Sequence, residues 1–247
     1  LKAKQRIEGV TVETPLIHSD VLSERLQRPV FLKCENLQKT GSFKLRGAYN
    51  RLSALSDEER KAGVVAFSSG NHAQGVTRAA KLLGMPAVIV MPHDTPAVKI
   101  NGVKRDGAEI VRYDRASESR ETIAARLCEE RGAVLVPSYD DPYIIAGQGT
   151  CGLEIAAQLP DGFNLGTLVC CVGGGGLIAG ISLAVRQSWP GVEIIGAEPH
   201  EYDDFARSLE AGERQSLTAY PPTICDALQT PTPGALTFAI NKDHLSG

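Results

Sequence analysis

Several features that would place this chain in a familiar class of protein are missing from its sequence. No apolar run approaches the roughly 20 residues that a helix needs to span a bilayer, and the polar opening LKAKQRIEG lacks the pattern of a signal peptide. The net charge is only −3, with acidic and basic residues interspersed, so there is no electrostatic footprint for nucleic acid or an anionic membrane. We therefore expect a cytoplasmic protein that binds a small molecule.

Aromatic residues and patterned cysteines are also scarce. Aromatic side chains make up 5% of the chain against 43% hydrophobic residues overall, which is typical of an aliphatic α/β enzyme rich in Gly and Ala. The six cysteines show no metal-ligand spacing, and we expect them to be reduced and mostly in the core: Cys34, Cys128, Cys151, Cys170, Cys171 and Cys225. For the adjacent pair Cys170 and Cys171, whose side chains point to opposite faces of a strand, we expect burial rather than reactivity.

Short apolar runs alternate with longer stretches of helical pattern, which predicts parallel strands covered by helices on both faces. The fold class is therefore α/β. Strands are expected at residues 64–67, 87–91, 109–113, 134–136, 167–172 and 192–197. Helices are expected at residues 73–83, 97–106, 117–131, 150–158 and 178–187.

The chain of 247 residues is long enough for two domains. Turn-forming residues at 137–142 mark a crossing between them. We place a small inserted substrate domain at residues 57–141 and a large cofactor-binding domain at residues 1–56 and 142–247. Beyond Tyr220 the pattern loosens into a proline-rich stretch, so we expect the large domain to lack its closing C-terminal elements.

Gly173-Gly174-Gly175-Gly176 follows an apolar strand and precedes a helix. Such a backbone can approach a phosphate closely and direct N–H groups at it from the helix N-terminus. A nicotinamide-dinucleotide turn is a rival interpretation, supported by Glu193 and Glu198 about 20 residues further on, although four glycines do not match GxGxxG. A tight turn that binds no ligand is the third.

Ser68-Ser69-Gly70-Asn71-His72 occupies a similar position between strand and helix. Two hydroxyls, an amide and an imidazole next to free backbone donors suit a carboxylate. Ser and Asn are also common helix caps, but capping explains one polar residue better than four. A third turn before a helix is expected at residues 147–150, where the sequence is GQGT, and by itself it is a weak signal.

Lys44 lies in the stretch SFKLRGA. A lysine amine becomes a nucleophile that can form a Schiff base when burial or a cationic neighbour lowers its pKa, and Arg46 is a candidate for that neighbour. An ordinary solvated lysine near the start of a helix is the other interpretation.

Four motifs in this order, SFKLRGA, SSGNHAQG, GQGTCGLE and CVGGGGLIAG, resemble those of the fold-type II pyridoxal-phosphate enzymes, particularly serine racemase and the serine/threonine dehydratases. The resemblance runs from Thr14 to about Leu228. It implies two open parallel-sheet domains and a homodimer. It also implies that Lys44 bonds covalently to pyridoxal 5'-phosphate and that residues 173–176 bind the cofactor phosphate. Asn71 would then hydrogen-bond the ring hydroxyl, and Phe43 would pack against the pyridine ring.

The resemblance implies a chemistry as well. The cofactor acidifies the substrate Cα–H by delocalising the carbanion, and Lys44 can take the proton from one face. Ser69 matches the serine that racemases place on the opposite face, where many related threonine dehydratases have alanine. Ser68, Ser69, Asn71 and His72 would bind the substrate carboxylate. Loss of the β-hydroxyl group would give a 2-oxo acid and ammonia, whereas proton return from the other face would racemise the substrate.

Arg120 aligns with an arginine that contacts a second substrate carboxylate in serine racemase-like enzymes, and a guanidinium suits bidentate carboxylate binding. It also lies at a charged helix start, where most arginines are solvated. If it binds substrate, L-threo-3-hydroxyaspartate joins L-serine and L-threonine as a natural substrate.

The segment EPHEYDD, residues 198–204, is either a solvated acidic loop or a site for a hard cation. Glu198, Asp204 and the backbone carbonyl of Tyr202 match the Mg²⁺ or Ca²⁺ ligands of serine racemase-like proteins, where water completes the shell. We expect a structural or activating ion.

The chain departs from the family at Ala227, where a glycine commonly lines the cofactor, and it ends before the hydroxyl or thiol that normally faces the pyridine nitrogen. The leading prediction is a pyridoxal-phosphate-dependent dehydratase, or ammonia-lyase, acting on a β-hydroxy amino acid. A racemase with the same site is the main alternative. A β-replacing enzyme of the cysteine synthase type and a non-catalytic nucleotide-binding module are the others.

Overall fold

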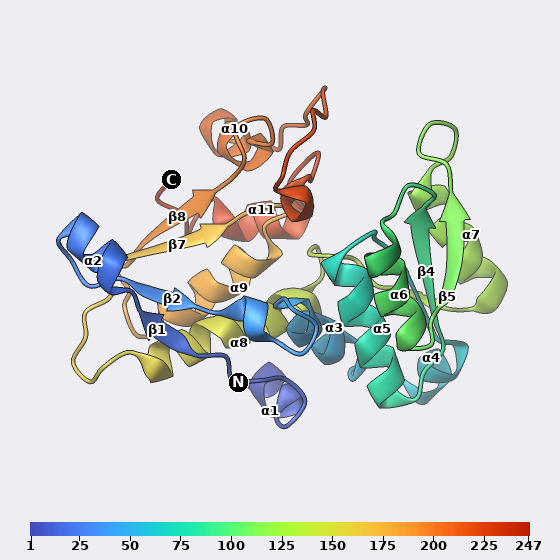
Figure 1. Cartoon of the computed structure of the whole chain (residues 1–247), viewed down its shortest axis with the longest axis horizontal. Coiled ribbons are helices and arrows are strands. Elements are labelled where there is room, and N and C mark those ends of the chain that lie inside the picture. Colours follow the sequence, from blue (N-terminus) through green and yellow to red (C-terminus); the bar gives the residue numbers. More distant parts are fainter.

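The computed structural model describes all residues from 1 to 247. Figure 1 shows two lobes. One lobe holds a four-stranded sheet with helices α4 to α7, and the other holds strands β1, β2, β7 and β8 with helices α8 to α11. No helix combines the length and the apolar character needed to cross a membrane.

The four-stranded sheet is parallel throughout, with the order β5-β4-β3-β6. Its strands are β3 (Val64–Phe67), β4 (Ala87–Pro92), β5 (Glu109–Tyr113) and β6 (Val134–Leu135). Its helices are α4 (Asp57–Ala62), α5 (Asn71–Leu83), α6 (Ala97–Arg105) and α7 (Arg120–Arg131). Alternate strand residues pack into different clusters, Val64 on one face and Val65 on the other. The sheet is therefore covered on both faces, and the predicted α/β fold is confirmed.

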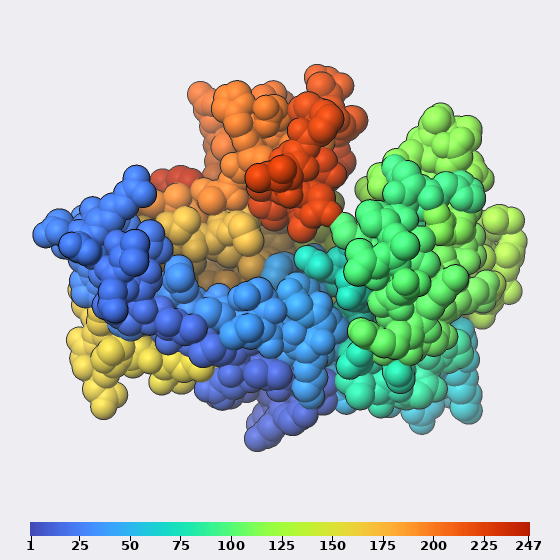
Figure 2. All heavy atoms as spheres, viewed as in Figure 1, coloured from blue at the N-terminus to red at the C-terminus, as the bar shows by residue number.

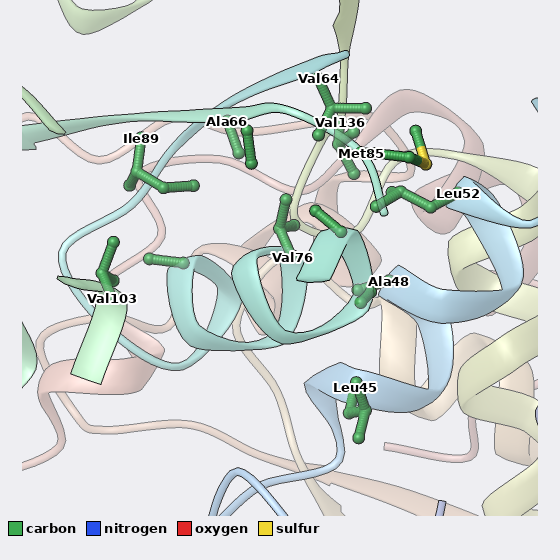
Figure 3. Packing of buried hydrophobic residues seen from close by; sticks show 14 of the residues in the cluster. Leu45, Ala48, Leu52, Val64, Ala66, Val76, Met85, Ile89, Val103 and Val136 are labelled. Carbon is green, nitrogen blue, oxygen red and sulfur yellow. The ribbon is translucent and has the colours of Figure 1, made fainter. Parts of the chain in front are cut away.

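Helix α3 (Lys44–Leu52) joins the first of these clusters through one side of the helix. Leu45, Ala48 and Leu52 recur at helical spacing and belong to the same hydrophobic cluster as Val76 of α5; Figure 3 shows α3 beside α5. All three α3 side chains are fully buried, and burying one leucine contributes roughly 1.5–3 kcal/mol. This packing fixes the helix whose first residue is Lys44.

The other lobe contains a small antiparallel sheet and a parallel pair of strands. The strands are β1 (Leu16–His18), β2 (Phe31–Lys33), β7 (Thr167–Cys171) and β8 (Glu193–Ala197). The helices are α1 (Lys2–Ile7), α2 (Asp20–Leu26), α8 (Pro142–Gln158), α9 (Gly176–Val185), α10 (Asp204–Ala211) and α11 (Ala235–Asn241), with 3₁₀ turns η1 (Glu35–Leu37) and η2 (Asp226–Leu228). The second parallel sheet that the sequence predicts therefore has two strands. The division into domains at residues 57 and 141 stays a prediction.

Helix α8 begins at Pro142 rather than at residue 150, so the expected third glycine turn is wrong. The carboxylate of Asp141 caps the helix by accepting from the first two free amides, and proline occupies its first position. The glycines at 147 and 149 serve helix packing instead. A Cβ on Gly147 would lie 2.5 Å from the Cα of Gly47, so its absence lets α3 and α8 approach closely. Helix α7 likewise begins at Arg120 instead of residue 117, because Ser119 caps it.

Candidate functional site

Lys44 is the first residue of α3, and its side chain is half-buried. Its Nζ donates a hydrogen bond to the carbonyl oxygen of Ser138 at 2.9 Å and lies 5.1 Å from the ring centroid of Phe43. Burial lowers the pKa of the amine to about 8, against an opposing effect of the Cys171 thiol. A measurable share of the amine is therefore neutral, and nucleophilic, at neutral pH.

Arg46 does not cause this shift, contrary to the expectation from sequence. Its fully buried guanidinium lies between two carboxylates, with Nη2 2.8 Å from Glu35 and Nη1 2.5 Å from Glu154. Lys33 of β2 also reaches Glu154, at 2.6 Å. The group ties together β2, η1, α3 and α8, so Arg46 anchors the helix that carries Lys44.

The loop Ser68–His72 connects β3 to α5, as predicted. The amide of Ser68 donates to Val90 of the neighbouring strand and that of Gly70 to the Ser68 hydroxyl. The amides of Ser69, Asn71 and His72 donate to no protein acceptor, and neither do the Ser69 and Asn71 side chains. These free donors at the N-terminus of a 13-residue helix suit a carboxylate.

The His72 side chain plays a different part from the one expected. It is buried, and its Nε2 donates to the carbonyl oxygen of Val136 at 2.9 Å. Burial first, and then the charge of Lys44, lower its pKa to about 3, so the imidazole is neutral. The prediction that this side chain binds the substrate carboxylate is therefore wrong, because the residue turns inward; only its backbone N–H is free.

The loop Gly173–Gly176 connects β7 to α9. The amides from Gly173 to Ile178 donate to no protein acceptor. The loop carbonyls are held from the other side: Thr237 donates to Gly174 at 2.6 Å and Asn241 to Gly175 at 3.1 Å. Gly175 has a φ of +87°, which favours glycine. This is a preformed anion cradle at a helix N-terminus.

Arg120 lies beside the loop Ser68–His72. Its Cζ is 5.1 Å from the ring centroid of Phe67, the residue that precedes the loop. Its Nε also donates to the neighbouring Glu121 at 2.8 Å. The Arg120 side chain is thus near the loop Ser68–His72 and 39% exposed, although its Nε–H group already donates to Glu121.

The acidic segment contains a buried carboxylate without partners. Both oxygens of Asp204 lack any hydrogen bond, and the side chain is fully buried. Burial, and then the nearby Glu198, raise the pKa of Asp204 to about 7. Glu198 itself accepts from the amides of Phe205 and Ala206, at 3.1 and 2.9 Å, and so caps α10. No three His, Cys, Asp or Glu side chains cluster around a metal-sized space; the predicted set of ligands has only two carboxylates.

Residues 7–247 match the family described as pyridoxal-phosphate dependent enzyme. The chain belongs to this family. It is 46% identical over its whole length to the L-threo-3-hydroxyaspartate ammonia-lyase of a Pseudomonas species, of which it covers 76%. It is 44% identical, over 99% of its length and 60% of the relative, to the L-threonine ammonia-lyase of Thermotoga maritima. The structure of maize serine racemase superposes with a TM-score of 0.94 at 41% identity, over 99% of this chain and 73% of that one.

These similarities confirm the family and the fold class that the motifs predict. The nicotinamide-dinucleotide interpretation of the glycine loop is displaced, because the family match covers almost the whole chain. The residues present also fit pyridoxal phosphate as a ligand. The buried Lys44 amine lies next to an aromatic ring, the Gly173–Gly176 loop offers free amides to a phosphate, and Asn71 has an unpartnered side chain.

Two residues of this pyridoxal-phosphate enzyme were missed or misjudged from sequence. Cys170 is buried as expected, but Cys171 is exposed. A hydrogen bond with Cys170 lowers the pKa of the Cys171 thiol to about 6, with a smaller contribution from Lys44, although partial desolvation of the sulfur opposes the shift. The strand alternation that buries one thiol exposes the other.

Sequence reasoning does not identify Tyr139, whose only signal in the sequence is its place in the crossing segment at residues 137–142. In the structure its ring lies 2.3 Å from the position that a Cβ on Gly174 would occupy.

Proposed function

We propose that this chain is a pyridoxal-phosphate-dependent ammonia-lyase that converts a β-hydroxy amino acid to a 2-oxo acid and ammonia. L-threo-3-hydroxyaspartate, L-serine and L-threonine are the candidate substrates, in line with the names of similar ammonia-lyases. One observation carries the proposal: the Lys44 amine at the start of α3 lies 2.9 Å from the Ser138 carbonyl oxygen and 5.1 Å from the centroid of the Phe43 ring, where desolvation lowers its pKa. Two loops with free amides, one suited to a carboxylate and one to a phosphate, would complete the site. In support, the charge of Lys44 acts on His72 in the first loop and interacts with Cys171 just before the second.

The cofactor, when bound, supplies an electron sink that acidifies the substrate Cα–H. Lys44 would then accept the proton from Cα at Nζ, which the Ser138 carbonyl orients. The free amides of the loop Ser68–His72 would hold the substrate carboxylate, and those of Gly173–Gly176 would hold the cofactor phosphate.

A racemase activity of the same site is the second candidate. The Ser69 hydroxyl lies on the substrate loop without a protein partner, which is what a second proton donor needs. Ser69→Ala should abolish racemisation of L-serine and leave elimination largely intact. Chiral chromatography of the amino acid remaining after partial turnover measures both. A wild-type enzyme that forms no D-serine would remove this candidate.

We also infer a Mg²⁺ or Ca²⁺ site formed by Glu198, Asp204 and the Tyr202 carbonyl. The two orphaned oxygens of Asp204 support it, as does the Tyr202 carbonyl, which accepts no backbone hydrogen bond. Ca²⁺ should raise the melting temperature of the wild type but not of Asp204→Asn. Glu201→Gln, in the same segment but outside the proposed ligand set, is the control that should keep the response.

A homodimer is the assembly that we infer. A surface hollow of about 590 Å³ is an apolar groove between α1, α8, α9 and α11 that includes none of the predicted site residues. Leu183 and Tyr143 on its walls are 42% and 39% exposed. Sedimentation equilibrium of the wild type should give twice the mass of one chain, and the Leu183→Glu variant should have the mass of a single chain. A monomeric wild type would contradict the inference.

The decisive experiment for the lyase is 2-oxo acid release from the three substrates in the presence of pyridoxal phosphate, with and without Mg²⁺. Wild type, Lys44→Ala and the control Lys39→Ala, an exposed lysine without an ion pair, are compared. Turnover that requires Lys44 but not Lys39 supports the proposal. A preference for hydroxyaspartate that Arg120→Gln removes would assign Arg120 to the second carboxylate. No 2-oxo acid from any substrate would refute the lyase.

A further inference from the structure

Lys99 and Asp226 form an ion pair between segments that are distant in the chain. Lys99 lies in the first turn of α6, beside the four-stranded sheet, and Asp226 begins the 3₁₀ turn η2 in the C-terminal part. Lys99 Nζ donates to Asp226 Oδ2. The two side chains are 28% and 58% exposed, so solvent and salt reach the pair.

This pair is the only polar link across the opening between the two lobes. No other hydrogen bond or ion pair joins residues 57–136 to residues 142–247. The lobes meet elsewhere through close packing, as where Gly75 of α5 abuts the Lys44 backbone; a Cβ there would lie 3.0 Å from it. In Figure 2 the orange C-terminal part and the green lobe face each other across a hollow.

Each partner also touches one of the two ligand loops. Lys99 Nζ lies 3.9 Å from the position of a Cβ on Gly70, in the loop Ser68–His72. On the other side, η2 lies against the loop Gly173–Gly176, because a Cβ on Gly173 would be 3.6 Å from the Cα of Leu228. The ion pair therefore connects the loop suited to the substrate carboxylate with the loop suited to the cofactor phosphate.

We propose that Lys99 and Asp226 are a positioning pair that holds these two loops at their working separation and must open for ligands to enter or leave. An ion pair this exposed contributes little, so it shifts the balance between closed and open forms by up to about five-fold. A weak link suits this task, since cofactor and substrate have to pass it. The proposal depends on cofactor binding and not on the lyase activity.

The test measures the rates at which the apo protein takes up pyridoxal phosphate and the loaded protein releases it, followed by the absorbance of cofactor bound to Lys44. Lys99→Met and Asp226→Asn each break the pair, and Lys99→Asp combined with Asp226→Lys exchanges the charges. Lys104→Met, an exposed lysine without an ion pair on the same helix, is the matched control. Each protein is measured at low and high salt, and the KM and kcat of the preferred substrate are measured alongside.

A positioning pair predicts that both single variants load and release the cofactor faster, by up to about five-fold, and lose part of the salt dependence of the wild type. The substrate KM should rise more than kcat falls, and the charge exchange should recover much of the wild-type behaviour. If the two residues acted only by general electrostatic steering, the cofactor uptake rate would change in opposite directions in Lys99→Met and Asp226→Asn. Lys104→Met would then change this rate in the same direction as Lys99→Met. Either result would overturn the proposal. Unchanged rates in both single variants would also overturn it. Cofactor rates that change as expected in a protein releasing no 2-oxo acid would leave this pair standing and refute only the lyase.

Discussion

The amine of Lys44 donates a hydrogen bond to the carbonyl oxygen of Ser138, a residue 94 positions further along the chain, at 2.9 Å. This contact joins the start of α3 to the segment in which the chain returns from the four-stranded sheet. The carboxylate of Asp140, two residues on, accepts from three amides at the start of α11, at 2.8 to 3.1 Å. The acceptor for Lys44 is thus fixed to the same lobe as the loop Gly173–Gly176.

The lowered pKa of Lys44 predicts the pH dependence of its reaction with pyridoxal phosphate. Only the neutral amine is a nucleophile, so the rate should rise with pH and level off above about 8. A lysine at its ordinary value of 10.5 would still be gaining rate at that point. Stopped-flow absorbance of the apo protein, with Lys44→Ala as the blank, measures the profile. A rate that keeps rising beyond pH 9 would contradict the burial argument.

Breaking the Arg46 group should destabilise the protein strongly. Arg46→Met leaves the buried carboxylate of Glu154 and the half-buried carboxylate of Glu35 without their main partner, and such a loss typically costs about 3–5 kcal/mol. The exposed pair Arg126 and Glu130 is the control, where Arg126→Met should change the free energy of unfolding by less than about 0.5 kcal/mol. Urea unfolding measures both. Equal effects in the two variants would show that burial does not matter here.

A methyl group at Gly147 should disturb the contact between α3 and α8. The Cβ would lie 2.5 Å from the Cα of Gly47, in backbone that cannot move aside cheaply. Overpacking of this kind costs about 1–3 kcal/mol. Gly166→Ala, where no atom lies within 4 Å, should be close to neutral. If thermal unfolding shows the same small change in melting temperature for Gly147→Ala and Gly166→Ala, then α3 and α8 have room for a methyl group between them.

Asp106 should contribute to the pH dependence of stability. Its carboxylate binds Arg78 at 2.7 Å and Lys81 at 3.2 Å, and although burial opposes the shift, these partners hold its pKa below the ordinary value of 3.8. The folded pKa is lower than the unfolded one, so the contribution is present above pH 3.8 and is lost as pH falls through the folded pKa. The difference in unfolding free energy between wild type and Asp106→Asn should therefore shrink below about pH 4. If this difference in unfolding free energy stays constant down to pH 2, Asp106 does not contribute to the pH dependence of stability.

Much of the fold follows from local pattern. The strands of the four-stranded sheet and the end of α5 at Leu83 lie where the sequence predicts them, because strand periodicity and helix periodicity are local properties. The start of α8 was wrong by eight residues. Its glycines resemble a turn in sequence, and only their contacts with the neighbouring helices show that they serve close packing.

The candidate site divides in the same way. The sequence by itself determined the α/β class and the two strand-loop-helix units with free amides, since glycine content and helix N-termini depend on neighbours in the chain. The tertiary structure alone decided that Lys44 contacts Ser138, that Arg46 faces two carboxylates, and that His72 turns inward while Cys171 turns out. These arrangements depend on which surfaces meet between segments that are not neighbours in the chain, and local periodicity does not encode that choice.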